Sequence, residues 1–282
     1  ILQGHVATVK TVAISPNNRF LASGTLATTT KNYTVRVWDF EKNRPIRELE
    51  GDTYAATTLD VNPSLTISPD SQYIASSTGN VLRIWRSDTG ELYQTLKGHG
   101  KAIKSLAMTT DSRYLVNNSN NHIKVWELEH KRLVHLLKSH TLQIESVSLS
   151  SDNRMIASGS QDKTLLKTLE AHGDFVNSVD ISSNNKFLVT SSSDATVKLW
   201  KLPEGELLAT ILTFNRGVDW FAMTPEGYFD GSNAGIKRAL WAMSGTLLHD
   251  LKAPAQFQTQ YYVPGMLTKI FQEQKIKIEE KK

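Results

Sequence analysis

Histidine, serine and aspartate recur together along this sequence, and they are the residues that many hydrolases use for nucleophilic catalysis. One such set is His140, Ser158 and Asp162. A catalytic triad is needed only once, whereas related polar sets return about every 40 residues here. We therefore interpret these sets as buried hydrogen-bonded chains that stabilise repeated structural units, and not as catalytic sites.

The sequence does not indicate a metal site or cysteine-based catalysis. The histidines that open the repeats, such as His99 and His140, occur once per unit, so the distance between units should keep them from one ion. The sequence contains no cysteine, which excludes disulfides, cysteine-ligated zinc and a cysteine nucleophile within this chain. We expect no catalytic residue, no metal site and no cofactor in it.

The elements that must position these polar sets are β-strands, which are indicated by two recurring patterns. The first is a short strand that ends in Trp, found at Val35–Trp38, Leu82–Trp85, Ile123–Trp126, Val197–Trp200 and, more weakly, Arg238–Trp241. The second is a small residue followed by a histidine, found at His5, His99, His140 and His172. A period of about 40–45 residues with these two patterns is typical of four-stranded propeller blades.

Each unit divides into four predicted strands. The first strand alternates in polarity, as in Val9–Ile14, and is followed by a turn that contains Asn, Asp, Ser or Pro, as at Asp70 and Asp152. An apolar second strand comes next, the Trp strand is third, and a strand such as Leu92–Leu96 is fourth. No segment has a sustained helical period, so the predicted fold class is all-β.

These patterns resemble the WD-repeat β-propeller family over about residues 1–212. The resemblance implies a propeller of four-stranded blades, with six blades visible here and seven or more in the full protein. In that family a His, a Ser or Thr, an Asp and the Trp form a hydrogen-bonded tetrad in each blade. The resemblance implies one complete structural tetrad in this chain, which is His172, Thr190, Asp194 and Trp200.

The other repeats match this tetrad only in part. The matching residues are His5, Ser23 and Trp38 in the first repeat, His99 and Trp126 in the third, and His140, Ser158 and Asp162 in the fourth. The departures at tetrad positions are Asn32, Asp52, Gly79, Asn117 and Asn120. The fourth repeat also has no Trp.

The fourth repeat is shorter than the others. Leu165–Leu169 resembles a fourth strand, yet it follows Thr164 directly, with no room for a third strand. Deleting a middle strand would leave two sheet edges unpaired. We therefore predict that about ten residues are missing between Thr164 and Leu165, since a Trp strand and a short turn have that length.

The last part of the sequence departs from the repeat pattern. Residues 217–251 predict a divergent sixth blade, with a third strand that ends at Trp241 and a fourth at Leu247–Leu251. Residues 252–282 are interpreted as an extension or a linker to a further domain. Over about residues 217–270 the chain resembles bacterial WD-repeat proteins that are joined to a caspase-like peptidase domain.

These observations favour a non-catalytic interaction or sensor scaffold, which the resemblance places in a larger bacterial protein with a caspase-like effector. The alternatives are a propeller subunit of another signalling or defence assembly and, with less support, a propeller enzyme. The formal net charge of +4 is small, and the aromatic residues belong to the repeat pattern, so a nucleic-acid partner is not expected. We expect protein partners on the loops or a face of the propeller, no membrane association and a cytoplasmic location.

The number of blades leads to one more expectation. Ile1–His5 reads as the end of a strand from a preceding blade, and an open gap between first and last blades would expose their apolar faces. We therefore expect the natural protein to extend upstream of Ile1.

Overall fold

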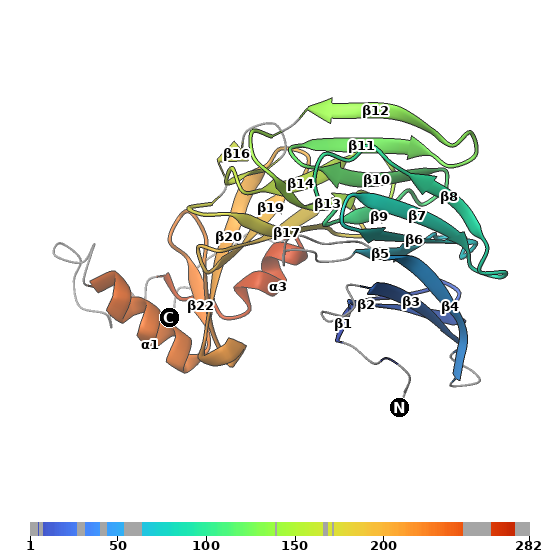
Figure 1. The fold of residues 1–282 in the computed structure, drawn as a ribbon. Helices are drawn as coiled ribbons and strands as arrows, with labels where there is room; N and C mark the ends of the chain where they lie inside the picture. The colour runs from blue at the N-terminus through green and yellow to red at the C-terminus, as the bar shows by residue number, and fades with distance from the viewer. Residues whose placement is uncertain are drawn as a thin grey trace. The chain divides into compact units, whose positions relative to one another are not determined.

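The computed structural model describes His5 and residues 8–26, 32–39, 44–53, 64–138, 140–165, 169–170, 172–244 and 261–273. The chain divides into two compact units, residues 1–183 and 184–282 (Figure 1). Strands form the first unit, whereas the second combines strands with helices. Within the described residues, the helices are all too short or too polar to cross a membrane.

The first unit contains the repeated four-stranded antiparallel sheets that the sequence predicts, which we number as blades 1 to 4. Blade 1 consists of β1 (Val9–Ile14), β2 (Phe20–Leu26), β3 (Asn32–Asp39) and β4 (Arg44–Thr53). Blade 2 consists of β5 (Leu65–Ile67), β6 (Tyr73–Thr78), β7 (Val81–Arg86) and β8 (Leu92–Leu96). Blade 3 consists of β9 (Leu106–Met108), β10 (Tyr114–Ser119), β11 (His122–Glu127) and β12 (Arg132–Lys138). Blade 4 consists of β13 (Ile144–Leu149), β14 (Ile156–Ser160), β15 (Thr164–Leu165) and β16 (Leu169–Glu170), and β17 (Val176–Ile181) ends the unit.

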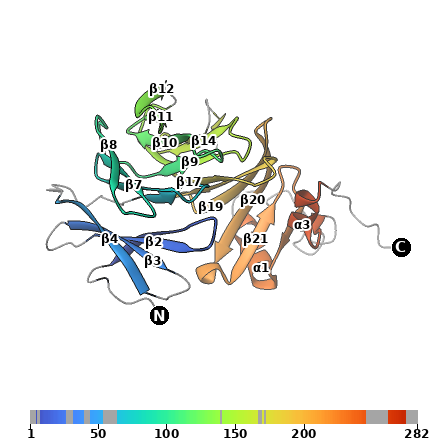
Figure 2. The ribbon, with the colours of Figure 1, turned by 90° about the vertical axis from the view of Figure 1, so that its right-hand side faces the viewer.

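Successive blades of the first unit contact one another through their first strands. β1 contacts β5, β5 contacts β9, β9 contacts β13, and β13 contacts β17. Apolar side chains from neighbouring blades fill the space between them; Leu82 and Leu115, for example, are fully buried in one cluster. Figures 1 and 2 show the fourth strands of blades 2 and 3, β8 and β12, at the outer ends of their sheets. This arrangement is that of a β-propeller.

The turns between first and second strands join blade 2 to blade 3 and blade 3 to blade 4. In blade 2 the Ser68 hydroxyl donates to Asp70 at 2.6 Å, and Asp70 accepts the backbone N–H of Gln72 at 2.9 Å. Such turns were predicted from their Asp, Asn and Ser content. The backbone N–H of Asp70 also donates to the Ser112 hydroxyl in the next blade at 3.0 Å. These turns therefore hold their own hairpins and also connect blade 2 to blade 3.

Blade 4 corrects the prediction for the fourth repeat. Thr164 and Leu165 form one short strand, so a third strand is present where none was expected, and the ten residues expected between them stay a prediction. They form the third strand of the sheet, and Leu169–Glu170 forms the fourth, in the order β13-β14-β15-β16. The short repeat keeps four strands by reducing the outer two to two residues each. Leu165, expected at the start of a fourth strand, pairs with Gly159 and is fully buried.

Gly159 lets the next strand approach blade 4 closely. A Cβ atom at this position would lie 2.6 Å from Val176 Cγ1 and 2.9 Å from Val179 Cγ1, both on β17. These distances are shorter than carbon–carbon contacts allow. The absence of a side chain therefore sets the spacing between β14 and β17.

The second unit replaces the expected sixth blade with a different arrangement. Its strands are β18 (Phe187–Ser192), β19 (Thr196–Lys201), β20 (Glu206–Phe214), β21 (Asp219–Met223) and β22 (Phe229–Gly231), paired antiparallel in that order. A 3₁₀ turn, η2 (Asn215–Gly217), joins β20 to β21, so the predicted strand–turn–strand after residue 217 extends the preceding sheet. The remaining elements among the described residues are the helices α1 (Asn233–Ser244) and α3 (Met266–Phe271). Arg238–Trp241, predicted as a third strand, lies inside α1, and Leu247–Leu251 lies outside the described residues.

Local interactions explain why α1 is a helix. The Ser232 hydroxyl accepts the backbone N–H of Gly235 at 3.1 Å, which is the contact of a serine N-cap. Ile236 and Ala239, three residues apart, are buried against Phe221 and Phe229 of the sheet. Helix α3 packs Met266 and Ile270 into a second apolar cluster of this unit. The repeat-like sequence before Trp241 is therefore overridden by a capped helix with one apolar face.

Candidate functional site

The predicted polar sets of blades 1, 3 and 4 each lie within one blade, and in blade 1 the set forms a short chain. The Trp38 indole Nε1 donates to the Ser23 hydroxyl at 2.6 Å, and His5 Nε2 lies 2.6 Å from the same hydroxyl. The His5 and Trp38 rings also meet edge to face, with centroids 5.7 Å apart. Burial, followed by the charge of Arg36, lowers the pKa of His5 below 6.5. The side chain of Asn32 lies outside the described residues.

Blade 2 contains a tryptophan contact that the sequence analysis missed. The Trp85 indole donates to the Ser76 hydroxyl at 3.2 Å, and both residues are buried. Ser76 lies nine positions before Trp85, as Asn117 does before Trp126, and this spacing was the signal for it. Of the two departures noted here, Asp52 has a side chain outside the described residues, and Gly79 lies in a turn.

In blade 3 an asparagine occupies the centre of the chain. The Trp126 indole donates to Asn117 Oδ1 at 2.8 Å, and the Asn117 amide nitrogen lies 3.2 Å from His99 Nδ1. If that amide donates to Nδ1, the proton of neutral His99 is on Nε2, which is buried without a hydrogen-bond partner. Burial, with a smaller effect of the Lys124 charge, lowers the pKa of His99 to about 4. His99 is therefore neutral at pH 7.

In blade 4 an aspartate completes the chain. His140 Nε2 lies 2.8 Å from the Ser158 hydroxyl, and His140 Nδ1 lies 3.1 Å from Asp162 Oδ2. Asp162 also accepts the Thr141 backbone N–H at 2.9 Å and the Thr164 hydroxyl at 2.7 Å. Burial alone would raise the pKa of Asp162, but these hydrogen bonds and the nearby His140 lower it to about 2.

The length of one turn explains the difference between blades 3 and 4. In blade 3 Ser119 pairs directly with His122, so Asn120 and Asn121 form a two-residue hairpin turn with Asn120 at φ 58°. The Asn120 amide donates to Asn121 Oδ1 at 3.2 Å and not to His99. In blade 4 the turn from Ser160 to Thr164 is longer and contains Asp162. The position that the resemblance assigned to Asn120 is therefore not equivalent to Asp162.

The fourth predicted set is divided between the two units. The Trp200 indole donates to the buried Thr190 hydroxyl at 3.0 Å. Asp194 accepts the backbone N–H and the hydroxyl of Thr196, at 2.9 and 2.6 Å. His172 is buried within the first unit, and its place in this tetrad stays a prediction.

The arrangement of these sets decides what chemistry they can perform. Each serine hydroxyl bound to a histidine, Ser23 or Ser158, is buried, whereas a nucleophile must reach its substrate. Where the structure describes the chain, no three His, Asp or Glu side chains gather closely enough to hold a metal ion. What these contacts do is tie the strands and turns of each blade together.

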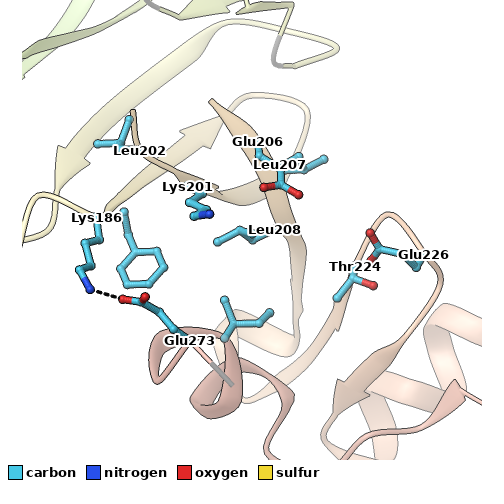
Figure 3. Close-up of a pocket in the computed structure, with 11 residues that line it drawn as sticks. Lys186, Lys201, Leu202, Glu206, Leu207, Leu208, Thr224, Glu226 and Glu273 are labelled. Carbon is cyan, nitrogen blue, oxygen red and sulfur yellow. Dashed lines mark hydrogen bonds and ion pairs between the residues drawn. The ribbon is translucent and has the colours of Figure 1, made fainter. Parts of the chain in front are cut away.

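The second unit contains a cavity of about 720 Å³ that the sequence analysis did not predict. It lies among β18, β19, β20 and α3, and Figure 3 shows Lys186 and Glu273 paired at one side of it. Phe187 and Ile270 supply apolar surface, and Lys201, Glu206 and Glu226 add charges of both signs. The buried Thr224 hydroxyl in its lining has no hydrogen-bond partner. This volume is in the range of small-molecule sites.

The repeats of this chain are similar to those of a known protein family and of two known proteins. A family model described as "WD domain, G-beta repeat" matches residues 1–39, 43–86, 90–127, 131–166 and 163–201. The chain is 29% identical over 101 residues to Small ribosomal subunit protein RACK1z of Arabidopsis thaliana. It is 28% identical over 104 residues to Small ribosomal subunit protein RACK1y of Oryza sativa subsp. japonica. The matched segments make up 36% and 37% of this chain and 27% of each relative, so the chain spans about a quarter of their length.

Proposed function

This chain belongs to the WD40 repeat family, and on that basis we propose that it is a non-catalytic protein-interaction scaffold. The observation that carries the proposal is the use of the polar sets within single blades. Ser23 and Ser158 are buried and hydrogen-bonded to histidines of their own blades, so these sets serve stability. A rigid array of blades then offers its loops, faces and outer strands to partners.

The finer proposal is that this scaffold regulates an effector in a larger bacterial protein, namely a caspase-like peptidase domain. It is supported by the sequence of residues 217–270, whose likeness to such proteins is described above. In such a protein the propeller binds a partner and the peptidase cleaves, so this chain needs no nucleophile of its own. The complete polypeptide would then contain a His and Cys pair outside residues 1–282.

Native size analysis of the source-cell extract tests the scaffold function. We expect the protein to migrate in a complex well above the mass of its own full-length polypeptide, and cross-linking with mass spectrometry to find partner peptides on the blades. The purified chain should not turn over an activated ester or a caspase-type peptide. Migration as a free polypeptide, or ester turnover that disappears in His140→Ala while the fold persists, would contradict the proposal.

A second candidate is a subunit of another assembly, and the names of the matched relatives favour it. Both are small ribosomal subunit proteins, although only about a quarter of each is matched. Sedimentation of the extract through a sucrose gradient separates the two candidates. Migration with ribosomal particles would favour the assembly subunit, whereas migration with a peptidase activity would favour the regulatory propeller.

A further inference from the structure

The outer strand of blade 3, β12, is a free sheet edge with exposed leucines. It is the last strand in the order β12-β11-β10-β9, so one row of its backbone N–H and C=O groups has no strand partner among the described residues. Leu133, Leu136 and Leu137 are 41%, 48% and 38% exposed. Leu133 and Leu136 lie opposite Trp126 and Lys124 in the register, and Leu137 lies opposite Ile123. The edge therefore presents apolar side chains on both faces of the sheet.

The side chains of β8 and the outer edge of β20 are covered more fully. In β8 the Tyr93 hydroxyl donates to the backbone oxygen of Leu128, at 3.2 Å, and the Gln94 amide donates to that of Lys131, also at 3.2 Å. Those contacts hold the side chains of β8 against blade 3. In the second unit the outer edge of β20 is paired with β21 along Thr210 to Phe214. Among the described residues β12 makes no such contact, and six of its seven residues are exposed.

The charges on β12 select among the possible occupants of this edge. The strand contains Arg132 and Lys138 at its ends, His135 at its centre, and no acidic residue. Arg132 donates to Glu127 of the neighbouring strand β11 at 2.8 Å. Lys138 is then the charged residue of β12 for which no such ion pair is described. A second copy paired antiparallel to β12 would place Arg132 opposite Lys138, and like charges in opposed positions destabilise a sheet. Pairing of two copies is therefore disfavoured.

We propose that β12 is a docking edge for an extended segment of a partner protein with apolar residues at its centre and acidic residues at its ends. The segment adds to blade 3 as a fifth strand. Its backbone pairs with the free edge, its apolar side chains pack on Leu133, Leu136 and Leu137, and its acidic end lies beside Lys138. This inference rests on the proposed scaffold function and names the surface that performs it.

A synthetic peptide tests the edge directly. The probe is a fluorescent nine-residue peptide with the centre Leu-Val-Thr-Val-Leu and two acidic residues at each end, and its binding is measured by fluorescence anisotropy. We expect saturable binding that weakens as salt is added, because charges contribute. Hydrogen exchange of the β12 amides should slow in the complex. A peptide with lysines in place of the acids, and one N-methylated on alternate residues, should both bind more weakly.

A pair of matched variants locates the site. Leu136→Glu should weaken peptide binding by about fivefold or more, since it removes one cross-strand pair and repels the acidic peptide. Leu92→Glu is the control, because Leu92 is 49% exposed on the outer strand of the neighbouring blade. It should leave the affinity within about twofold, as expected for a surface change away from the site.

The outcomes separate this proposal from the scaffold function. No saturable peptide binding, or equal effects of Leu136→Glu and Leu92→Glu, would overturn the docking edge even if the protein still migrates in a large complex. Migration as a free polypeptide in the extract would overturn the scaffold function itself. Dimerisation of the purified chain that Leu136→Glu abolishes would also overturn the proposal, in favour of a second copy.

Discussion

Blades 3 and 4 hold their buried histidines with different residues. In blade 3 the chain runs from Trp126 through Asn117 to His99 and stops at a histidine nitrogen without a partner. In blade 4 there is no tryptophan, yet the ring nitrogens of His140 both have partners, Ser158 and Asp162. One blade is thus anchored by the packing of an indole, and the other by the hydrogen bonds of a carboxylate.

The difference comes from turn length, which decides whether an aspartate can reach the histidine. The two-residue hairpin turn of blade 3 has no room for a residue equivalent to Asp162. Four experiments can sharpen or break this comparison, beginning with the largest expected effect.

Removing the Trp126 indole should give the largest loss of stability. Trp126→Ala should lower the free energy of unfolding by about 3 kcal/mol, because packing is lost and the Asn117 oxygen is left unpaired. Trp126→Phe keeps most of the packing and should cost about 1–2 kcal/mol, the effect of an unmade buried hydrogen bond. Urea denaturation measures both values. Equal costs for the two variants would show that the hydrogen bond, and not the packing, anchors this blade.

Removing the Asp162 carboxylate should lower the stability of blade 4. Asp162→Ala leaves the Thr141 N–H without its acceptor and His140 Nδ1 with only the Thr164 hydroxyl at 3.1 Å, at a cost of about 2 kcal/mol. Asp152→Ala is the matched control, since Asp152 binds Ser150 in an exposed turn of the same blade, and it should cost less. Thermal melts with hydrogen exchange on β14 provide the measurement. If Asp152→Ala destabilises the protein more than Asp162→Ala, the stability of blade 4 comes from the hydrogen bonds of its turn and not from those of its histidine.

Acid should weaken blade 3 before blade 4. The pKa of His99 is about 4 in the folded chain against an ordinary 6.5, so its stabilisation is complete above pH 6.5 and is lost as the pH falls towards 4. The pKa of Asp162 is about 2 against 3.8, so its contribution is lost only between pH 3.8 and 2. Stability measured from pH 8 to pH 4 should therefore fall less steeply in His99→Gln than in the parent. Parallel curves would mean that other groups cause the loss.

The smallest expected effect is on the pKa of His99, when the nearby charge of Lys124 is removed. Lys124 is the second contribution after burial, and its ammonium group donates to the Gly98 carbonyl at 2.5 Å. Lys124→Met removes the charge and should raise the pKa of His99 by a small amount, because burial remains. An NMR titration of the ring protons would detect the change. A pKa that stays at about 4 would assign the whole shift to burial.

The fold could be predicted from the sequence wherever a repeat is complete. The tryptophans mark third strands, as Trp38 in β3 and Trp126 in β11 confirm, and the Asp and Asn turns occur where predicted. The hydrogen bonds of Trp38 with Ser23 and of His140 with Asp162 lie within the sets that the family resemblance grouped together.

Three features could not be predicted from the repeat pattern. Arg238–Trp241 has the order of a tryptophan strand, but the Ser232 cap and the buried Ile236 and Ala239 make the segment helical. The unpaired nitrogen of His99 depends on one turn being short, and spacing between repeats does not report the length of a single hairpin. The free edge at β12 follows from three-dimensional neighbours, which the strand sequence does not specify.

The close approach at Gly159 restricts how this chain can vary. Position 159 looks like one small residue among the Ala, Ser and Gly of the second strands, yet even a methyl group there would overlap Val176 and Val179. A library of all twenty amino acids at this position would lose nearly every member to a displaced β17, whereas a library at the exposed Leu92 would retain most of its members. Tolerance to substitution in this molecule is therefore set by the distance to the next blade, and a residue with no side chain is among the hardest to replace.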